Sequence, residues 1–182
     1  MLRDLLEKTI VERCLHRGAV VDFYHDDIEL PNGRRSARDY FRHPGAVCVI
    51  PFLDAKNVII LKQYRYAIKQ AIWEFPAGKI DGHEDPLMCA KRELLEETGY
   101  SGKIRKIVSF WPSPALLDER MHVYLAWDLK KSGAMDTDED EFIEVHTISF
   151  AKVLRDITTG RIRDAKTIIA ALACAQYRLT PP

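Results

Sequence analysis

The stretch from Gly78 to Tyr100, GKIDGHEDPLMCAKRELLEETGY, constrains this chain more than any other part of it. A lone acid at Glu84 is followed by the run 92–97, in which three carboxylates share little more than one helical turn. Like charges three or four residues apart on a helix destabilise it by a few tenths of a kcal/mol. The run therefore requires a positively charged partner.

Local signals place these acids on a helix. Asp85 is a favourable N-cap, and Pro86 suits the first helical position because its φ is fixed and it lacks a donor. Gly99 supplies the left-handed residue that ends a helix. The apolar residues that recur at helical spacing, and that we expect to be buried, are Leu87, Ala90 and Leu94.

Two interpretations of the acidic run are open. At 3.6 residues per turn, Glu93 and Glu97 lie one above the other with Glu96 beside them. Oxygen-only ligands of this kind suit a hard divalent cation such as Mg²⁺ or Mn²⁺. The alternative is a solvated acidic face, eased by ion pairs such as Arg92–Glu96.

The complete string favours the metal site. Gly, five residues, Glu, seven residues and then Arg-Glu-Leu-x-Glu-Glu-x-Gly-Tyr resembles the Nudix box at every fixed position. The resemblance implies a Nudix hydrolase, an α/β fold in which a mixed sheet lies in an α/β/α sandwich. Such an enzyme cleaves a nucleoside diphosphate linked to another group, X.

Composition is that of an ordinary soluble globular protein. The chain has 182 residues, 47% of them apolar and 30% charged, which is enough for one domain with a sizeable core and a small appendage. Twenty-seven basic and twenty-seven acidic residues balance, so no global field draws the chain to nucleic acid or to an anionic membrane. No apolar run approaches the ~20 residues of a membrane span, and charges interrupt residues 1–15, which excludes a secretory signal.

The cysteines indicate a reducing compartment. They show no C-x-x-C spacing and no paired histidine, so we expect buried free thiols and a cytoplasmic protein. The four positions are Cys14, Cys48, Cys89 and Cys174.

The N-terminal quarter is predicted to form a β-hairpin. Residues 1–17 carry a poor signal and are expected to form a short helix or an irregular lead-in. Residues 19–30 read as a strand, Pro31-Asn32-Gly33 as a turn, and residues 34–42 as the return strand. A lone hairpin is marginal in water, so this one must pack on the main domain or on a partner chain.

After His43-Pro44-Gly45, strands and helices interleave. The expected strands are 46–53, 58–63, 121–129 and 141–149, and the expected helices after the box are 150–158 and 165–177.

Several short sequences resemble the ADP-ribose pyrophosphatase branch of the Nudix hydrolases, namely ELPNG, HPGAV and Asp164-Ala165-Lys166-Thr167. Members of this branch exchange an N-terminal sheet across a homodimer. The resemblance implies an N-terminal β subdomain over residues 1–43, for dimerisation and substrate contacts, and a catalytic domain over 44–182.

The resemblance also implies roles within the box. Glu93 and Glu97 bind divalent ions, the Ala77 carbonyl adds a ligand, and Glu96 supports or bridges the ions. The residues with a structural role in the motif are Gly78, Glu84, Arg92 and Gly99, and Arg92 is the expected partner of Glu84.

A second acidic cluster, residues 136–141, reads by itself as a solvated loop. ADP-ribose pyrophosphatases carry glutamates on the corresponding loop. Matched by the strand that follows, Glu141 falls at a metal-ligand position and Glu139 at the position of the catalytic base.

Substrate contacts are expected from arginines, whose forked donors suit diphosphate oxygens. Arg65 and Arg42 resemble the family's phosphate or ribose contacts, and the alternative for Arg42 is a surface ion pair. Tyr24 is expected either to stack on a base or to pack in the core. Glu74 is expected to orient the sugar or an arginine.

The loop after the box bears on the substrate. Ser113 and Pro114 match two positions of the branch's Ser-Pro-Gly, and Ala115 replaces the glycine, a change that is strained where φ is positive. We therefore expect hydrolysis of ADP-ribose to AMP and ribose 5-phosphate, extended to GDP-mannose and other nucleoside diphosphate sugars. The alternatives are another substrate, such as NADH, a dinucleotide or an oxidised nucleotide, and a non-catalytic nucleotide-sugar sensor.

Overall fold

The computed structural model describes residues 5–136 and 142–176 and divides the chain into two compact units. The first unit comprises residues 1–45 and 111–120, and the second comprises residues 46–110 and 121–182. The segment 111–120, which contains the Ser-Pro-Ala sequence, thus belongs to the first unit, although the residues before and after it in the chain belong to the second. It runs beside β4 (Arg35–Arg42), where the Phe41 amide donates to the Leu116 carbonyl (2.8 Å) and the Asp118 amide donates to the Phe41 carbonyl (3.2 Å).

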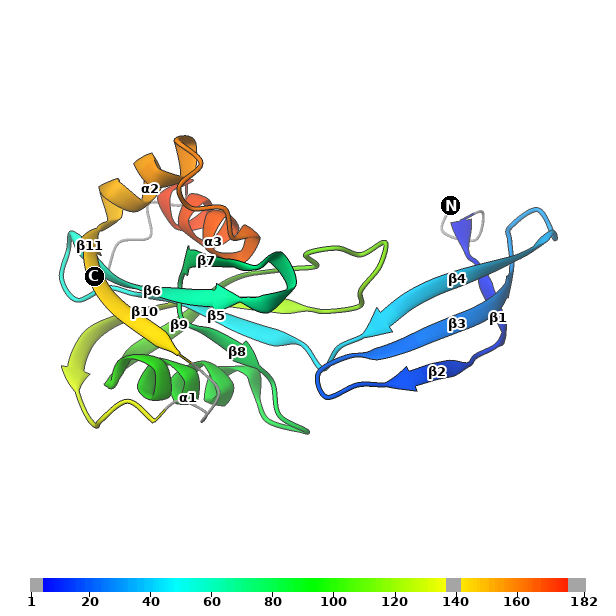
Figure 1. Ribbon diagram of the computed structural model, residues 1–182, viewed down its shortest axis with the longest axis horizontal. Helices are drawn as coiled ribbons and strands as arrows, with labels where there is room; N and C mark the ends of the chain where they lie inside the picture. The colour runs from blue at the N-terminus through cyan, green and yellow to red at the C-terminus, as the bar shows by residue number, and fades with distance from the viewer. Residues whose placement is uncertain (1–4, 137–141, 177–182) are drawn as a thin grey trace. The chain divides into compact units, whose positions relative to one another are not determined.

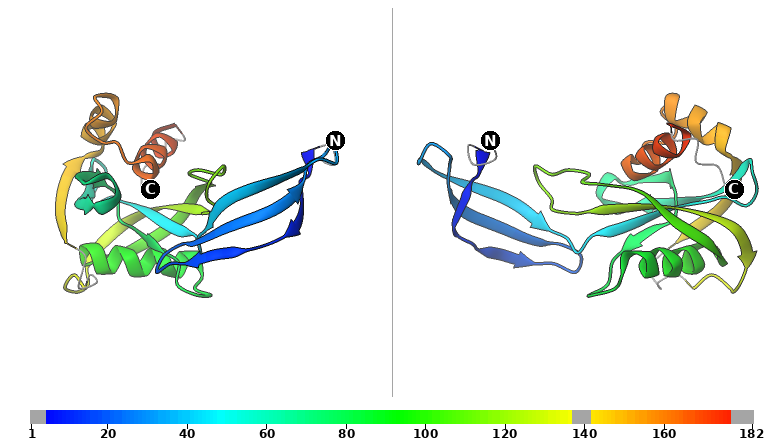
Figure 2. Two further views of the ribbon diagram at one scale, coloured as in Figure 1. Left: turned by 45° about the vertical axis from the view of Figure 1, so that its right-hand side comes forward. Right: turned by 180° about the vertical axis from the view of Figure 1, so that it is seen from behind.

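The first unit is an antiparallel sheet, drawn as a single layer in Figure 2. β3 lies at its centre, with β4 on one side and with β1 and β2 on the other. The predicted hairpin is confirmed, and Gly33 turns the chain with a φ of 81°. The strands are β1 (Lys8–Val11), β2 (Cys14–Arg17), β3 (Asp22–Glu29) and β4 (Arg35–Arg42).

The expectation of a helix or an irregular lead-in at residues 1–17 is wrong, because this segment contributes β1 and β2. Its charged residues had concealed the strand pattern. In the sheet these charges pair across strands, as in Lys8 with Glu29 and Arg13 with Asp27. Cross-strand ion pairs stabilise an exposed sheet without any apolar alternation.

Over its described residues, 46–110, 121–136 and 142–176, the second unit forms two sheets and three α-helices, whose arrangement is drawn in Figure 1. One sheet has the order β8-β5-β10-β9 and is mixed, because β5 and β10 are parallel while the other pairs are antiparallel. The other is antiparallel, with the order β11-β6-β7. The strands are β5 (Ala46–Pro51), β6 (Asn57–Arg65), β7 (Gln70–Glu74), β8 (Ala77–Lys79), β9 (Tyr100–Phe110), β10 (Met121–Lys131) and β11 (Ile143–Ser149). The helices are α1 (Pro86–Thr98), α2 (Phe150–Thr158) and α3 (Ala165–Gln176), with a short 3-10 turn at Tyr66–Ile68.

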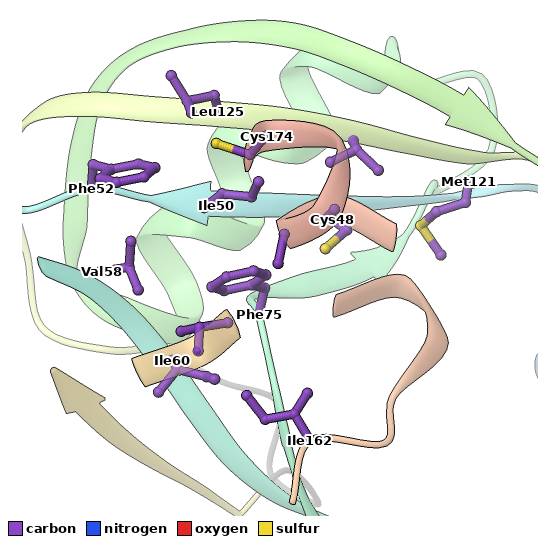
Figure 3. Close-up of a cluster of buried hydrophobic side chains, with 14 of the residues drawn as sticks. Cys48, Ile50, Phe52, Val58, Ile60, Phe75, Met121, Leu125, Ile162 and Cys174 are labelled. Atoms are coloured by element: carbon purple, nitrogen blue, oxygen red, sulfur yellow. The ribbon is translucent and has the colours of Figure 1, made fainter. Parts of the chain in front are cut away.

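Strand β5 separates two hydrophobic cores. Its side chains alternate, so Cys48 and Ile50 face one core while Val47 and Val49 face the other. The first core, seen in Figure 3, also contains residues of β6, α2 and α3. The second contains Ala90, Leu94 and other residues of α1. The α/β sandwich is therefore confirmed, with α1 on one side of the mixed sheet and α2 and α3 on the other.

Three of the four cysteines, Cys48, Cys89 and Cys174, are buried free thiols, and Cys14 is free and partly exposed. Burial raises the pKa of Cys89 to about 12, so this thiol is protonated at neutral pH. In the described part of the chain, no helix is both long and apolar enough to cross a bilayer.

Candidate active site

The acidic helix α1 begins and ends where the sequence predicts. The Asp85 carboxylate accepts a hydrogen bond from the Leu87 amide at 2.8 Å, and Pro86 is the first helical residue. Gly99 has a φ of 74°, and its amide donates to the Leu95 carbonyl. These caps fix the phase of the helix, so that Leu94 packs in the core while Arg92, Glu93 and Glu96 lie at the partly exposed surface.

Arg92 is the positive partner that the carboxylates of the box require. Its guanidinium makes two hydrogen bonds to Glu84, at 3.2 and 3.0 Å, and one each to Glu93 at 2.8 Å and Glu96 at 2.9 Å. The expected Glu84–Arg92 pair is thus present, and so is the Arg92–Glu96 pair. The hydrogen bonds from Arg92 hold the pKa of Glu84 below its ordinary value, and the bond to Glu84 raises the pKa of Arg92.

Glu97 joins the helix to the segment that precedes the box. The residue is 2% exposed, and its Oε2 accepts a hydrogen bond from the Ala77 amide at 2.8 Å. The contact observed at Ala77 is therefore made by its amide, and the role of its carbonyl as a metal ligand stays a prediction.

Gly78 opens the box because there is no room for a side chain. A Cβ placed on it would lie 1.9 Å from Oε1 of Glu93 and 2.4 Å from Oε2. The φ of Gly78 is not positive, so the requirement is steric. The absence of this one carbon lets the Glu93 carboxylate lie directly against the backbone.

The residues of the box fit a hard divalent cation by their chemistry. Glu93, Glu96 and Glu97 offer only oxygen ligands, and the gap at Gly78 accommodates one of these carboxylates. Over residues 5–136 and 142–176, however, no group of three His, Cys, Asp or Glu side chains is arranged to hold a metal. Oxygens of Glu93 and Glu96 bind Arg92 instead.

A second charged cluster lies in the same unit. Arg65, at the end of β6, binds Glu74, at the end of β7, through Nε and Nη2 at 2.9 Å each. Glu74 is 1% exposed, whereas the Arg65 side chain is 39% exposed. Burial is the largest influence and lowers the pKa of Arg65, but the hydrogen bond to Glu74 and the negative charges of the nearby carboxylates together raise it above its ordinary value. Of the two roles expected for Glu74, the structure therefore shows the orientation of an arginine.

Three residues at the start of α3 complete this cluster and were assigned no role from the sequence. Lys166 binds Glu74, and also Asp164 at 3.0 Å. The Thr167 hydroxyl donates to Asp164 at 2.6 Å and accepts from the Phe75 amide at 2.9 Å. The Asp-x-x-Thr spacing marks an N-cap, but no local signal connects it to a glutamate 92 positions earlier.

In the first unit, Arg42 is bonded to Glu12, at 3.3 and 2.5 Å, and its Cζ lies 4.2 Å from the centre of the Tyr24 ring. Tyr24 is 6% exposed and stacks on Tyr40 with a centroid separation of 5.4 Å. The alternatives of an ion pair for Arg42 and of core packing for Tyr24 are therefore the contacts present. Contact of either residue with substrate stays a prediction.

The Ser113-Pro114-Ala115 loop is a tight turn in which the Ser113 carbonyl accepts from the Leu116 and Leu117 amides, at 3.0 and 2.9 Å. Ala115 does not adopt a positive φ, so the replacement of glycine introduces no backbone strain. The strain expected at Ala115 is absent, so the expected extension to GDP-mannose gains no support from this residue.

Glu139 and Glu141 lie outside the described residues. The last described residue before them is Asp136, whose amide donates to the Glu96 carbonyl at 3.1 Å. Shortly after them begins β11, where Ile143 pairs with Gln63, two residues before Arg65.

Comparison with known proteins agrees with this geometry. The model of the NUDIX domain matches residues 42–170. The chain is 42% identical to an ADP-ribose pyrophosphatase of Bacillus subtilis, over 93% of this chain and 92% of that one. It is 43% identical to a methanol dehydrogenase activator of Bacillus methanolicus, over 90% of each.

A more distant relative is a GDP-mannose pyrophosphatase of Escherichia coli, 33% identical over 75% of each chain. Among solved structures, an ADP compounds hydrolase matches with a TM-score of 0.83 and 20% identity, over 95% of both chains. This structural match supports the fold.

Proposed function

We propose that this chain, which belongs to the NUDIX family, hydrolyses the diphosphate bond of nucleoside diphosphate sugars. ADP-ribose, cleaved to AMP and ribose 5-phosphate, is the first expected substrate, and GDP-mannose is the second. The names of relatives that share most of the chain's length support both substrates.

One observation carries the proposal. The four residues from Glu74 to Ala77 connect an arginine to the acidic helix, because Glu74 holds Arg65 and the Ala77 amide holds Glu97. The negative charge of Glu97 contributes to the raised pKa of Arg65, as expected for neighbouring groups. A diphosphate on this segment would therefore meet a fixed guanidinium on one side and a cluster of carboxylates on the other.

We infer that Mg²⁺, with Mn²⁺ as the alternative, is held by Glu93, Glu97 and the Ala77 carbonyl, with support from Glu96. When bound, such an ion neutralises phosphoryl oxygens and lowers the pKa of a coordinated water. Glu97 keeps the helix in register with Ala77, and Arg65 orients the diphosphate through its exposed guanidinium.

The general base is proposed to come from the acidic loop, with Glu139 as base and Glu141 as a further metal ligand. Asp136, which precedes Glu139 by three residues, lies next to the helix that carries the box, because its amide donates a hydrogen bond to the Glu96 carbonyl. This contact of Asp136 supports the proposal for Glu139 and Glu141.

We further propose that the chain is a cytoplasmic homodimer whose N-terminal β subdomain supplies Arg42 and Tyr24 to the substrate site. Apolar side chains exposed on the first unit, among them Leu15 at 57% and Val20 at 56%, support burial against a second copy. Sedimentation equilibrium tests this proposal, and a monomer at micromolar concentration would contradict it.

Activation of a dehydrogenase is a second candidate, favoured by the 43% identity to the methanol dehydrogenase activator. The test measures methanol oxidation by methanol dehydrogenase, with and without the chain. A rate that does not change eliminates this candidate and leaves hydrolysis untouched.

The deciding experiment for hydrolysis is a product-resolved assay in Mg²⁺ with ADP-ribose, GDP-mannose, UDP-glucose, NADH and 8-oxo-dGTP side by side. Cleavage of ADP-ribose and GDP-mannose supports the proposal, whereas cleavage of NADH or 8-oxo-dGTP alone overturns the substrate class. Glu97→Gln, which keeps an acceptor for the Ala77 amide, should reduce kcat by about 10³-fold if charge at this position is required. A sensor would instead release no product and would retain its thermal stabilisation by ADP-ribose in the variant.

A further inference from the structure

The start of α3 is attached to the segment that connects Arg65 to the acidic helix. Lys166 binds the Glu74 carboxylate, and the Thr167 hydroxyl accepts from the amide of Phe75, the next residue. Two consecutive residues of the helix thus contact two consecutive residues of the segment.

Glu74 is shared by two cations that differ in exposure. Both pair with its carboxylate, yet the side chain of Lys166 is 14% exposed and that of Arg65 is 39% exposed. Arg65 uses Nε and Nη2 for this pair, so Nη1 takes no part in it. The buried cation therefore meets the carboxylate from inside, while the guanidinium extends toward solvent.

Asp164 fixes the position of Lys166. One of its oxygens accepts from the Lys166 ammonium at 3.0 Å, and the other accepts from the amide and the hydroxyl of Thr167 at 2.9 and 2.6 Å. Burial alone lowers the pKa of Lys166, but the carboxylates of Glu74 and Asp164 raise it above its ordinary value. Lys166 is therefore a charged group with a defined location.

We propose that Lys166 is a positioning residue for the substrate diphosphate, acting through Glu74 on Arg65. The carboxylates of Glu74 and Asp164 bring two negative charges next to Arg65, and without Lys166 these three residues would carry a net charge of −1, which opposes an incoming anion. With Lys166 the four residues carry two positive and two negative charges, so that Glu74 orients Arg65 without a surplus of negative charge beside it. The inference rests on the proposed function.

The test is Lys166→Met, assayed with ADP-ribose at saturating Mg²⁺. Loss of the buried charge leaves the carboxylate of Glu74 less balanced in the substrate and transition-state complexes alike. KM should therefore rise about tenfold while kcat changes less than about threefold. Lys166→Gln keeps a hydrogen-bond donor without the charge, and it should give the same rise. Lys152→Met, which removes an i,i+4 pair with Asp156 on α2, is the matched control and should leave both constants unchanged.

A double-mutant cycle separates positioning from a general loss of stability. In an Arg65→Ala background, Lys166→Met should raise KM less than twofold further, because the residue through which it acts is gone. A tenfold rise in that background overturns the inference, and so does a fall in kcat at constant KM. If Lys166→Met does not fold, Lys166→Gln carries the same cycle.

Failure of the proposed function is recognisable in the same experiment. If wild-type protein cleaves no nucleoside diphosphate sugar, thermal stabilisation by ADP in Mg²⁺ replaces KM as the readout. Normal cleavage by wild type with an unchanged KM in both Lys166 variants overturns the role of Lys166 alone.

Discussion

Replacement of Gly78 by alanine should lower kcat/KM by at least about 10²-fold while leaving the fold intact. The added Cβ would lie 1.9 Å from Oε1 and 2.0 Å from Cδ of Glu93, whereas ordinary contacts begin near 3.4 Å. The carboxylate must therefore move by about 1.5 Å. Because the φ of Gly78 is not positive, alanine introduces no backbone strain of its own. The whole effect should consequently fall on the position of Glu93.

The expected size follows from the tolerance of a metal site. Ligand distances vary by only about 0.2 Å, and a displacement of about 1 Å in a catalytic constellation can reduce the rate about 10²-fold. A shift of about 1.5 Å should thus lower kcat/KM by at least about 10²-fold, equivalent to about 2.7 kcal/mol. Steady-state hydrolysis of ADP-ribose across a Mg²⁺ titration measures the loss, and the Mg²⁺ concentration at half-maximal rate should rise with it.

Gly133→Ala is the matched control. A Cβ there would meet only Cδ1 of Leu95 at 3.7 Å, an ordinary contact, and its φ is not positive either. Its activity should stay within about twofold of wild type. If Gly78→Ala folds normally and retains full activity and normal Mg²⁺ dependence, then Glu93 does not need this position. The steric argument for a glycine at residue 78 is then refuted.

Two further predictions concern stability. Thr167→Val leaves the buried Phe75 amide without its hydroxyl acceptor, which should lower the free energy of unfolding by roughly 1–3 kcal/mol and Tm by several degrees. The control Thr158→Val, at an exposed site, should change the free energy of unfolding by less than about 0.5 kcal/mol. Equal effects of the two variants in denaturant titrations would contradict the role of the Thr167 hydroxyl. Because Arg92 lowers the pKa of Glu84 from 4.5, the stability from this pair is present above that pH and is lost as pH falls through the folded-state pKa. Wild type should therefore lose more Tm than Glu84→Gln between pH 6 and about pH 3, and parallel pH profiles would count against the pair.

The acidic helix was predictable because everything that defines it is local. The Asp85 cap, the helical phase and the left-handed Gly99 lie within fifteen residues of one another, and each acts through neighbours in sequence. The same holds for the pairing of Arg92 with Glu96, which follows from helical spacing, whereas the pairing of Arg92 with Glu84 was expected from the resemblance to the Nudix box. Short-range geometry thus accounts for this half of the candidate site.

The contacts of Glu74 were only half predictable. The sequence indicated that it would orient either an arginine or the sugar, and hairpin pairing of β6 with β7 brings Arg65 within reach. Lys166 reaches the same carboxylate from 92 positions away, through the packing of α3 on the sheet core. A lysine one residue inside a helix reads locally as a surface residue, so only the tertiary structure reveals its burial.

The prediction for residues 1–17 was wrong for a different reason. Their strand partners lie nearby in sequence, but a strand is recognised by alternating apolar residues, and here charged residues interrupt that alternation and pair with one another, as in Lys8 with Glu29 and Arg17 with Asp22. Edge strands of an exposed sheet bury little apolar surface, so their sequences need not alternate apolar and polar residues.

The two charged clusters differ in net charge, and this difference predicts different ligands for them. Glu84, Glu93, Glu96 and Glu97 bring four negative charges to the single positive charge of Arg92, so these five residues favour an added cation. The four residues around Glu74 balance two against two, so they require no ion to be stable. Within this neutral set Arg65 is the cation that extends farthest toward solvent, and its guanidinium can bind an anion. We therefore expect a metal-bound diphosphate to suit both clusters, with its cation at the carboxylates of the box and its oxygens at Arg65.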